Sequence, residues 1–257
     1  MKMTVCELPS DWPTAEHDWQ VFKTELGNQA SEWVLLPEMP FCNWMAGGRA
    51  VDPDRWKVAV EAHDYWIRRL AELPASVVIG SRPVIDGGRF FNEGFIWQKF
   101  SGYRAVHRKY YLPNEEGFWE ASWYARGEGD FRVVAIDGLQ IGFLICTELW
   151  FGARAREYAR QGVHLLVCPR ATPADATDKW IAGGMAAAVV AGAFCISSNF
   201  NGPNVEGLPF GGVGWVIEPE EGRVLCRTSQ ANSIVTIDID PVWAEKAKQT
   251  YPRYVRD

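Results

Sequence analysis

Apolar and polar positions alternate along this chain with two periods, one typical of strands and one typical of helices. The apolar run from Ser31 to Leu36 ends at Pro37, which predicts a buried strand followed by a loop. Asp52-Pro53 then has the form of a helix start, with an N-cap residue before a proline. Apolar positions recur after it at helical spacing, at Trp56, Val60, His63, Ile67 and Leu70. We expect one face of this helix to pack on a sheet.

Two hairpins are predicted by turn sequences that separate apolar segments. Asp86-Gly87-Gly88 lies between residues 83–85 and 89–97, and Asp137-Gly138 lies between residues 131–136 and 139–146. Aspartate followed by glycine favours tight turns with positive φ. The second arm of the second hairpin is predicted to end at Cys146.

The second half of the chain alternates between helical and strand patterns. Helices are predicted at residues 153–161, at 179–190 and after Asp240-Pro241, and strands at 77–80, 164–168, 195–199, 212–217 and 233–239. No repeat or Pro/Ser-rich linker interrupts the pattern, so we expect one domain over residues 1–257. Because hairpins occur within an α/β alternation, a mixed sheet is more consistent with the pattern than a purely parallel one.

Composition narrows the classes of partner. The chain has 257 residues, of which 47% are hydrophobic, and this is enough for a large core. Its formal net charge of −6 argues against nucleic acid or an anionic membrane as a partner. The N-terminus lacks the apolar stretch of a secretory signal, and no segment reaches the roughly 20 apolar residues of a membrane span. We therefore expect a cytoplasmic protein.

Cysteine and histidine spacing gives no sign of a metal or redox site. The six cysteines show no short paired spacing, and the four histidines are scattered. Most of the cysteines are predicted to be small buried side chains. We expect no metal and no organic cofactor. These residues are Cys6, Cys42, Cys146, Cys168, Cys195, Cys226, His17, His63, His107 and His164.

Three residues with complementary chemistry stand beside strand ends or turns. They are Glu38 in LLPEMPF, Lys109 in HRKYYLPNEEGF and Cys146 in GFLIC. Taken singly, each has a structural explanation: a loop acid, a strand-end cation and a buried cysteine. A free thiol has a pKa of about 8.5, so a nucleophilic cysteine needs a base or a positive neighbour. Together in a dry site the three provide the parts for acyl transfer.

The segments LLPEMPF, RKYYLPNEEGF and FLICTELWF, with the later FGGVGWVIEPEEGRVL, resemble the carbon-nitrogen hydrolase (nitrilase) superfamily, in which glutamate, lysine and cysteine occur in this order at strand ends. The resemblance implies an α/β fold: a four-layer α-β-β-α sandwich with two mixed sheets, dimerising through helices. It makes Cys146 the nucleophile and Glu38 the base. Lys109 and the backbone N–H of Thr147 would stabilise charge on the substrate.

The resemblance also implies a second acid shortly after the lysine. The segment NEEGFWE offers Glu115, Glu116 and Glu120. We select Glu116, directly before Gly117, as the acid that holds Lys109. Two neighbouring carboxylates raise each other's pKa, which would help one of them to stay protonated.

Specificity is predicted from aromatic residues that follow the motifs. Phe41, Trp44, Trp119, Trp150 and Phe151 could line a pocket for an apolar or aromatic acyl group, although any tryptophan could instead pack in the core.

Charged residues near the motifs could likewise have either a functional or a structural role. Arg170 in CPRATP could reach the pocket or form a structural salt bridge. Trp150 stands where many members of the superfamily carry arginine, which weakens any interpretation that needs an arginine there for a substrate carboxylate. Glu148 is expected to support the site rather than react, and His107 to pack or hydrogen-bond.

These features together predict a cysteine-dependent hydrolase of non-peptide carbon-nitrogen bonds. The favoured reaction is release of ammonia from a small primary amide through a Cys146 thioester. We expect the protein to form a homodimer or a larger assembly of identical chains. Cleavage of N-carbamoyl compounds and hydrolysis of nitriles are alternatives. A catalytically silent binding module is the alternative of another class, and the retention of Glu38, Lys109 and Cys146 argues against it.

Overall fold

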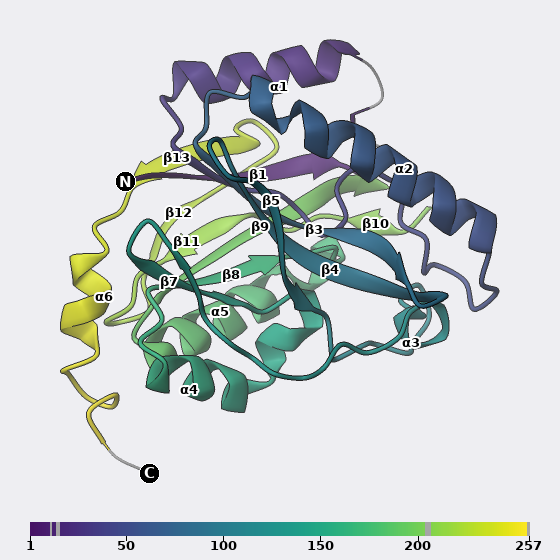
Figure 1. Ribbon diagram of the computed structural model, residues 1–257. Helices are drawn as coiled ribbons and strands as arrows, with labels where there is room; N and C mark the ends of the chain where they lie inside the picture. Colours follow the sequence, from purple (N-terminus) through teal and green to yellow (C-terminus); the bar gives the residue numbers. More distant parts are fainter. Residues whose placement is uncertain (11, 14–15, 204–206, 256–257) are drawn as a thin grey trace.

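The computed structural model describes residues 1–10, 12–13, 16–203 and 207–255. Its strands form two mixed halves that are joined where the end of β1 pairs in parallel with β9, through Glu7 to Pro9 and Asn199 to Asn201 (Figure 1). The first half runs β5 (Gly102–Arg108), β4 (Arg89–Gln98), β3 (Val77–Asp86), β2 (Trp33–Leu35), β1 (Lys2–Pro9), with β13 (Ile234–Asp238) antiparallel to β1. The strand order of the second half is β9 (Phe194–Pro203), β8 (Leu165–Pro169), β7 (Leu139–Phe143), β6 (Val134–Ile136). Strand β9 also pairs with β10 (Pro209–Phe210) and with β11 (Trp215–Ile217). Strand β11 in turn pairs with β12 (Val224–Arg227).

Helices cover the outer faces of the two halves (Figure 1). The helices α1 (Glu16–Asn28) and α2 (Pro53–Arg69) lie on one side, and α4 (Gly152–Arg160) and α5 (Thr177–Ala191) lie on the other. This arrangement is the expected α-β-β-α sandwich. The remaining elements are short: η1 (Leu70–Glu72), α3 (Glu120–Trp123), η2 (Cys146–Trp150), η3 (Ala174–Ala176) and α6 (Val242–Ala247). None of the helices in the described ranges is both long enough and apolar enough to cross a membrane.

Alternation along the strands divides the core into two layers. In β3, Val77 and Ile79 belong to the cluster between the sheets, whereas Val78 between them packs in the cluster under α1 and α2. In β2, Leu35 and Val34 divide in the same way. Successive side chains of a strand point to opposite faces, so a strand covered on both faces is apolar throughout.

The predicted start of α2 and both predicted hairpins are confirmed. The Asp52 side chain accepts hydrogen bonds from the backbone N–H groups of Asp54 and Arg55, at 3.0 and 3.1 Å. The turns Asp86 to Arg89 and Asp137-Gly138 join β3 to β4 and β6 to β7. One boundary was wrong, because β7 ends at Phe143 and Cys146 begins the helical turn η2 instead of ending the strand.

Candidate active site

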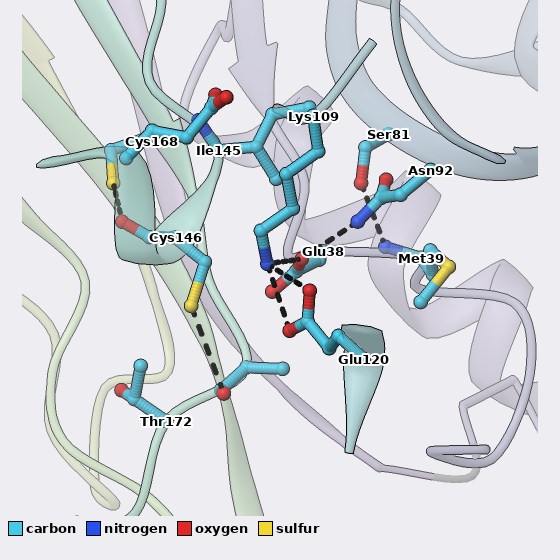
Figure 2. A network of polar contacts seen from close by, with 12 residues as sticks. Glu38, Met39, Ser81, Asn92, Lys109, Glu120, Ile145, Cys146, Cys168 and Thr172 are labelled. Carbon is cyan, nitrogen blue, oxygen red and sulfur yellow. Dashed lines mark hydrogen bonds and ion pairs between the residues drawn. The ribbon is translucent and has the colours of Figure 1, made fainter. Parts of the chain in front are cut away.

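Glu38 and Lys109 meet at the ends of two strands of the same half. Glu38 follows β2, and Lys109 follows β5 directly. The Lys109 Nζ donates to Glu38 Oε1 at 2.7 Å, and Asn92 of β4 donates to the same oxygen at 2.7 Å (Figure 2). All three side chains are buried. The strand ends therefore hold a charged pair away from water.

Glu120 is the second acid of this cluster. Both of its carboxylate oxygens lie within 2.8 Å of Lys109 Nζ, and its side chain is fully buried at the start of α3. We had expected Glu116 to make this contact. Glu116 is exposed, and Glu115 is exposed one residue earlier, because the turn at Gly117 directs this part of the loop outward before the chain returns at α3. The sequence alone does not distinguish the buried Glu120 from its exposed neighbours Glu115 and Glu116; the structure does.

Cys146 approaches the cluster from the second half of the fold. Its backbone has a φ of 49°, a left-handed conformation that is costly for a residue with a side chain. Its Sγ lies 4.0 Å from the carbonyl oxygen of Ala171, and only 4% of the residue is exposed. Figure 2 shows the thiol beside the Lys109 ammonium and the carboxylates of Glu38 and Glu120. The tight turn thus presents the thiol to the cluster.

Burial and charge set the protonation states of the site. Burial alone would lower the pKa of Lys109, but the carboxylates of Glu120 and Glu38 raise it above its usual range, so Lys109 stays an ammonium. Burial raises the pKa of Glu120, and the nearby Lys109 opposes that shift. Burial, reinforced by the charge of Glu38, also raises the pKa of the Cys146 thiol, while Lys109 lowers it. The Cys146 side chain at rest is therefore a thiol, which would need a base to act as a nucleophile.

The two carboxylate oxygens of Glu38 have different surroundings. Glu38 Oε2 is buried and accepts no hydrogen bond from the described residues, whereas Oε1 is occupied by Lys109 and Asn92. A buried polar atom without a partner costs about 1–3 kcal/mol, so such an atom in a site is typically completed by water or ligand.

Glu148 connects the turn that carries Cys146 to the strand end that carries Lys109. It is fully buried, and its carboxylate accepts from the backbone N–H of Ile145 at 2.9 Å and from that of Tyr110 at 2.8 Å. The Nε2 atom of His107 lies 2.8 Å from the Glu148 carboxylate. The expected supporting contacts of Glu148 and His107 are therefore present in the geometry.

A cavity of about 270 Å³ opens above Cys146. Cys146 and Glu120 lie at its buried end, with Thr147 and Trp150, two of the expected pocket residues, on its wall. The other lining residues were not predicted as pocket residues: Pro113, Glu115, Phe118, Ala171, Thr172, Pro173, Ala176, Lys179 and Trp180. They come from the loop after Lys109, from the segment after β8 and from the start of α5, where the sequence does not show which side chains face the cavity.

Four expected aromatic residues do not line the cavity. Phe151 stacks on Tyr111, with ring centroids 3.4 Å apart. Phe41 packs against Trp12 and His63 in the core beneath the helices. Trp44 packs on Phe118 and donates to the carbonyl of Gly117 at 2.9 Å. Trp119 is not among the residues that line the cavity, and Arg49 lies 3.9 Å over its ring. None of these rings lines the space above Cys146, and Trp44 supports its wall through Phe118.

Arg170 is a structural cation. It is fully buried and donates to Ser197 Oγ, Thr172 Oγ1 and the carbonyl of Val213, at 2.7, 2.8 and 2.6 Å. Burial lowers its pKa to about 10. It is absent from the cavity lining but fixes Thr172, which is part of it.

The acids of the cluster are already matched by a cation of the protein, since Lys109 lies between Glu38 and Glu120. Among the described residues, no three His, Cys, Asp or Glu side chains are grouped so that they could hold a metal ion.

Comparison with known proteins agrees with the fold and the motifs. The family model for carbon-nitrogen hydrolases matches residues 8–249, and the chain therefore belongs to the carbon-nitrogen hydrolase family. The crystal structure of a carbon-nitrogen hydrolase from Helicobacter pylori G27 has a TM-score of 0.87 and 20% identity, covering 98% of this chain and 94% of that one. Its fold is shared.

Curated relatives match over shorter stretches. The chloroplastic omega-amidase of Arabidopsis thaliana is 28% identical over 155 residues, which cover 57% of this chain and 42% of the relative. The N-carbamoylputrescine amidase of the same plant is 30% identical over 74 residues, covering 29% and 25%. The chain thus spans less than half the length of these relatives. Both are amidase-type enzymes by name, in keeping with the class of the family.

Proposed function

We propose that this protein hydrolyses a small primary amide to a carboxylic acid and ammonia through a thioester on Cys146. The observation that carries the proposal is the buried thiol at the end of a cavity, facing a carboxylate–ammonium–carboxylate cluster. Membership in the carbon-nitrogen hydrolase family and the amidase names of its relatives support the same reaction class.

In the first half-reaction, Cys146 Sγ attacks the amide carbon while its proton passes to Glu38. Because burial keeps the thiol protonated, proton removal has to accompany attack. Negative charge develops on the amide oxygen, where Lys109 Nζ and the backbone N–H of Thr147 are the donors. One such donor is worth about 3–4 kcal/mol. Glu38 then protonates the nitrogen, the C–N bond breaks, and ammonia leaves.

In the second half-reaction, water hydrolyses the thioester. Glu38, again ionised, removes a proton from water as the oxygen attacks the acyl carbon. The C–S bond breaks, the proton returns to the sulfur, and the carboxylic acid departs. Glu120 is assigned the role of holding Lys109 in place as an ammonium, because both of its oxygens contact Nζ. One carboxylate therefore serves both half-reactions.

Acid-quenched intact-mass measurement tests this mechanism. Wild-type protein mixed with a panel of primary amides, N-carbamoyl compounds and nitriles and quenched during turnover should gain the mass of one acyl group from an amide, and the adduct should map to Cys146. Cys146→Ala should gain none. An amide that is hydrolysed with the adduct on another residue, or with none in any quench, would overturn the assignment.

N-carbamoyl cleavage is the second candidate, because one relative is named an N-carbamoylputrescine amidase. In the same panel this alternative predicts turnover of the N-carbamoyl compounds in preference to simple amides.

A homodimer through α4 and α5 is part of the proposal. These helices pack side by side and leave an apolar groove on the outside of the fold, lined by Leu149, Trp150, Gly152, Ala155, Ala182, Gly183, Ala186, Ala187 and Val190. Light scattering of Ala186→Glu should show a shift from dimer toward monomer, and a wild type that is already monomeric would contradict the proposal.

A further inference from the structure

Two side chains of opposite charge line the exposed end of the cavity. Lys179, in the first turns of α5, and Glu115, in the loop before α3, are both exposed, whereas Cys146 and Glu120 at the other end are buried. The cavity thus has a closed reactive end and a charged mouth.

These two charges differ from the others near the site. Lys109 is bound by two carboxylates, and Arg170 by three acceptors. In the described ranges, neither Lys179 nor Glu115 forms an ion pair with another side chain. Their charges are therefore available to a ligand.

Trp150 and Trp180 stand together on the wall of the cavity. The rings of Trp150 and Trp180 are 5.0 Å apart at 57°, and Lys179 Nζ lies 5.6 Å from the centre of the Trp150 ring. Trp150 also lies directly against α5 at Gly183, where an added Cβ would come within 2.9 Å of the ring. Trp150 thus holds the ammonium at the mouth, since a cation over an indole face is favoured.

We propose, resting on the hydrolase function above, that the preferred substrate is the ω-amide of an α-amino acid. Its carboxylate pairs with Lys179, and its ammonium pairs with Glu115. Its methylene chain lies along Trp150 and its amide carbon reaches Cys146. A ligand with only one of these charges leaves the other charge at the mouth unmatched, and a neutral amide leaves both unmatched.

Four amides of similar chain length separate the contributions. L-glutamine carries both charges, glutaric acid monoamide only the carboxylate, 4-aminobutyramide only the ammonium, and butyramide neither. Hydrogen bonds to charged groups are worth about 1.5–3 kcal/mol, so we expect kcat/KM of the wild type for L-glutamine to exceed that for butyramide by at least about tenfold.

Two variants then assign each charge to its partner. Lys179→Met should lower the ratio of kcat/KM for glutaric acid monoamide to that for butyramide by about tenfold, and Glu115→Gln should do the same for 4-aminobutyramide. Lys246→Met and Glu61→Gln remove exposed charges on α6 and α2, away from the cavity, and should leave both ratios unchanged.

The outcomes separate this inference from the function on which it rests. If butyramide is hydrolysed as well as L-glutamine, or if Lys179→Met and Glu115→Gln leave the ratios unchanged, the substrate assignment is overturned and the hydrolase remains. If none of the four amides is hydrolysed and none leaves an acyl group on Cys146, the primary-amide function fails, and the substrate assignment fails with it.

Discussion

At the scale of single residues, the site depends on one ammonium that serves two carboxylates. Lys109 contacts Glu38 through one oxygen and Glu120 through both. Burial alone would favour a neutral lysine, but the charges of the two acids raise the pKa of Lys109 and keep it an ammonium. In the proposed mechanism, this charge stabilises the oxygen of the substrate during attack.

Glu120→Gln should therefore lower kcat by about 10- to 1000-fold, the range found when one charge-stabilising group is lost, with a smaller effect on KM. The glutamine keeps the shape but not the charge that holds Lys109. Steady-state kinetics of ammonia release measure the effect, and circular dichroism checks the fold.

Glu116→Gln is the matched comparison, because it makes the same chemical change four residues away at an exposed position. The structure predicts kinetics close to those of the wild type. A large loss in Glu116→Gln with little change in Glu120→Gln would reverse the assignment of the second acid.

The protonation state of Cys146 gives a second prediction at this scale. Burial, with Glu38, raises the pKa of the thiol in the free enzyme, so the thiolate becomes populated only under alkaline conditions. The rate of Cys146 alkylation by iodoacetamide should rise steadily from about pH 6 to about pH 9, around and above the ordinary thiol range. Peptide mass mapping separates this reaction from that of the other cysteines. A plateau near neutral pH would mean a preformed thiolate and no need for Glu38 as the base.

At the scale of elements, Glu148 fixes the distance between η2 and the end of β5. Its carboxylate accepts from Ile145, next to Cys146, and from Tyr110, next to Lys109. Glu148→Gln replaces one accepting oxygen by a donating amide, which leaves a buried N–H without a partner at a cost of about 1–3 kcal/mol. We expect kcat to fall by about tenfold or more while KM changes little, because a small displacement of nucleophile and cation affects the chemical step.

Glu157→Gln on α4 is the control for that change, since Glu157 is partly exposed and pairs only with Arg154 among the described side chains. Equal kinetic effects of the two variants would show that Glu148 has no positioning role.

Packing of β7 against α4 gives a prediction about stability. A Cβ added at Gly142 would come within 2.9 Å of the Tyr158 ring, which cannot retreat because its hydroxyl donates to Phe143 O at 2.9 Å and accepts from Phe143 N. Gly142→Ala should lower the free energy of unfolding by about 1–3 kcal/mol. Gly27→Ala in α1, where a Cβ meets nothing within 4 Å, should raise it by about 0.5–1 kcal/mol. Urea denaturation measures both, and equal changes would contradict the packing argument.

Elements with local signals were predictable from the sequence. The cap at Asp52 and the turn at Asp137-Gly138 are set by residues close in the chain, so α2 and the β6–β7 hairpin were predicted correctly. The end of β7 was not, because the conformation of Cys146 is imposed by Glu148 and its tertiary contacts rather than by the local pattern.

At the scale of the whole molecule, the site lies where strand ends of both halves of the sandwich meet. Glu38 and Lys109 come from the first half, and Cys146 comes from the second. Motifs in the right order selected three residues that the structure brings together. The burial of Glu120 in place of Glu116, and the presence of Trp180 but not Phe41 in the cavity wall, depend on how loops return across the fold, which spacing along the chain does not encode.

The same scale explains why the pocket prediction was only partly right. Trp150 lines the cavity because η2 directs it toward α5, whereas Phe41 and Trp44 turn into the core. An aromatic residue that follows a motif is equally suited to either place, since both bury the ring.

The most direct test of the central claim is ammonia release from primary amides by the wild type beside Cys146→Ala. The thioester mechanism predicts release by the wild type, and loss of it in a variant that keeps the wild-type circular dichroism spectrum and melting temperature within a few degrees. Ammonia release at an undiminished rate by folded Cys146→Ala would rule out Cys146 as the nucleophile.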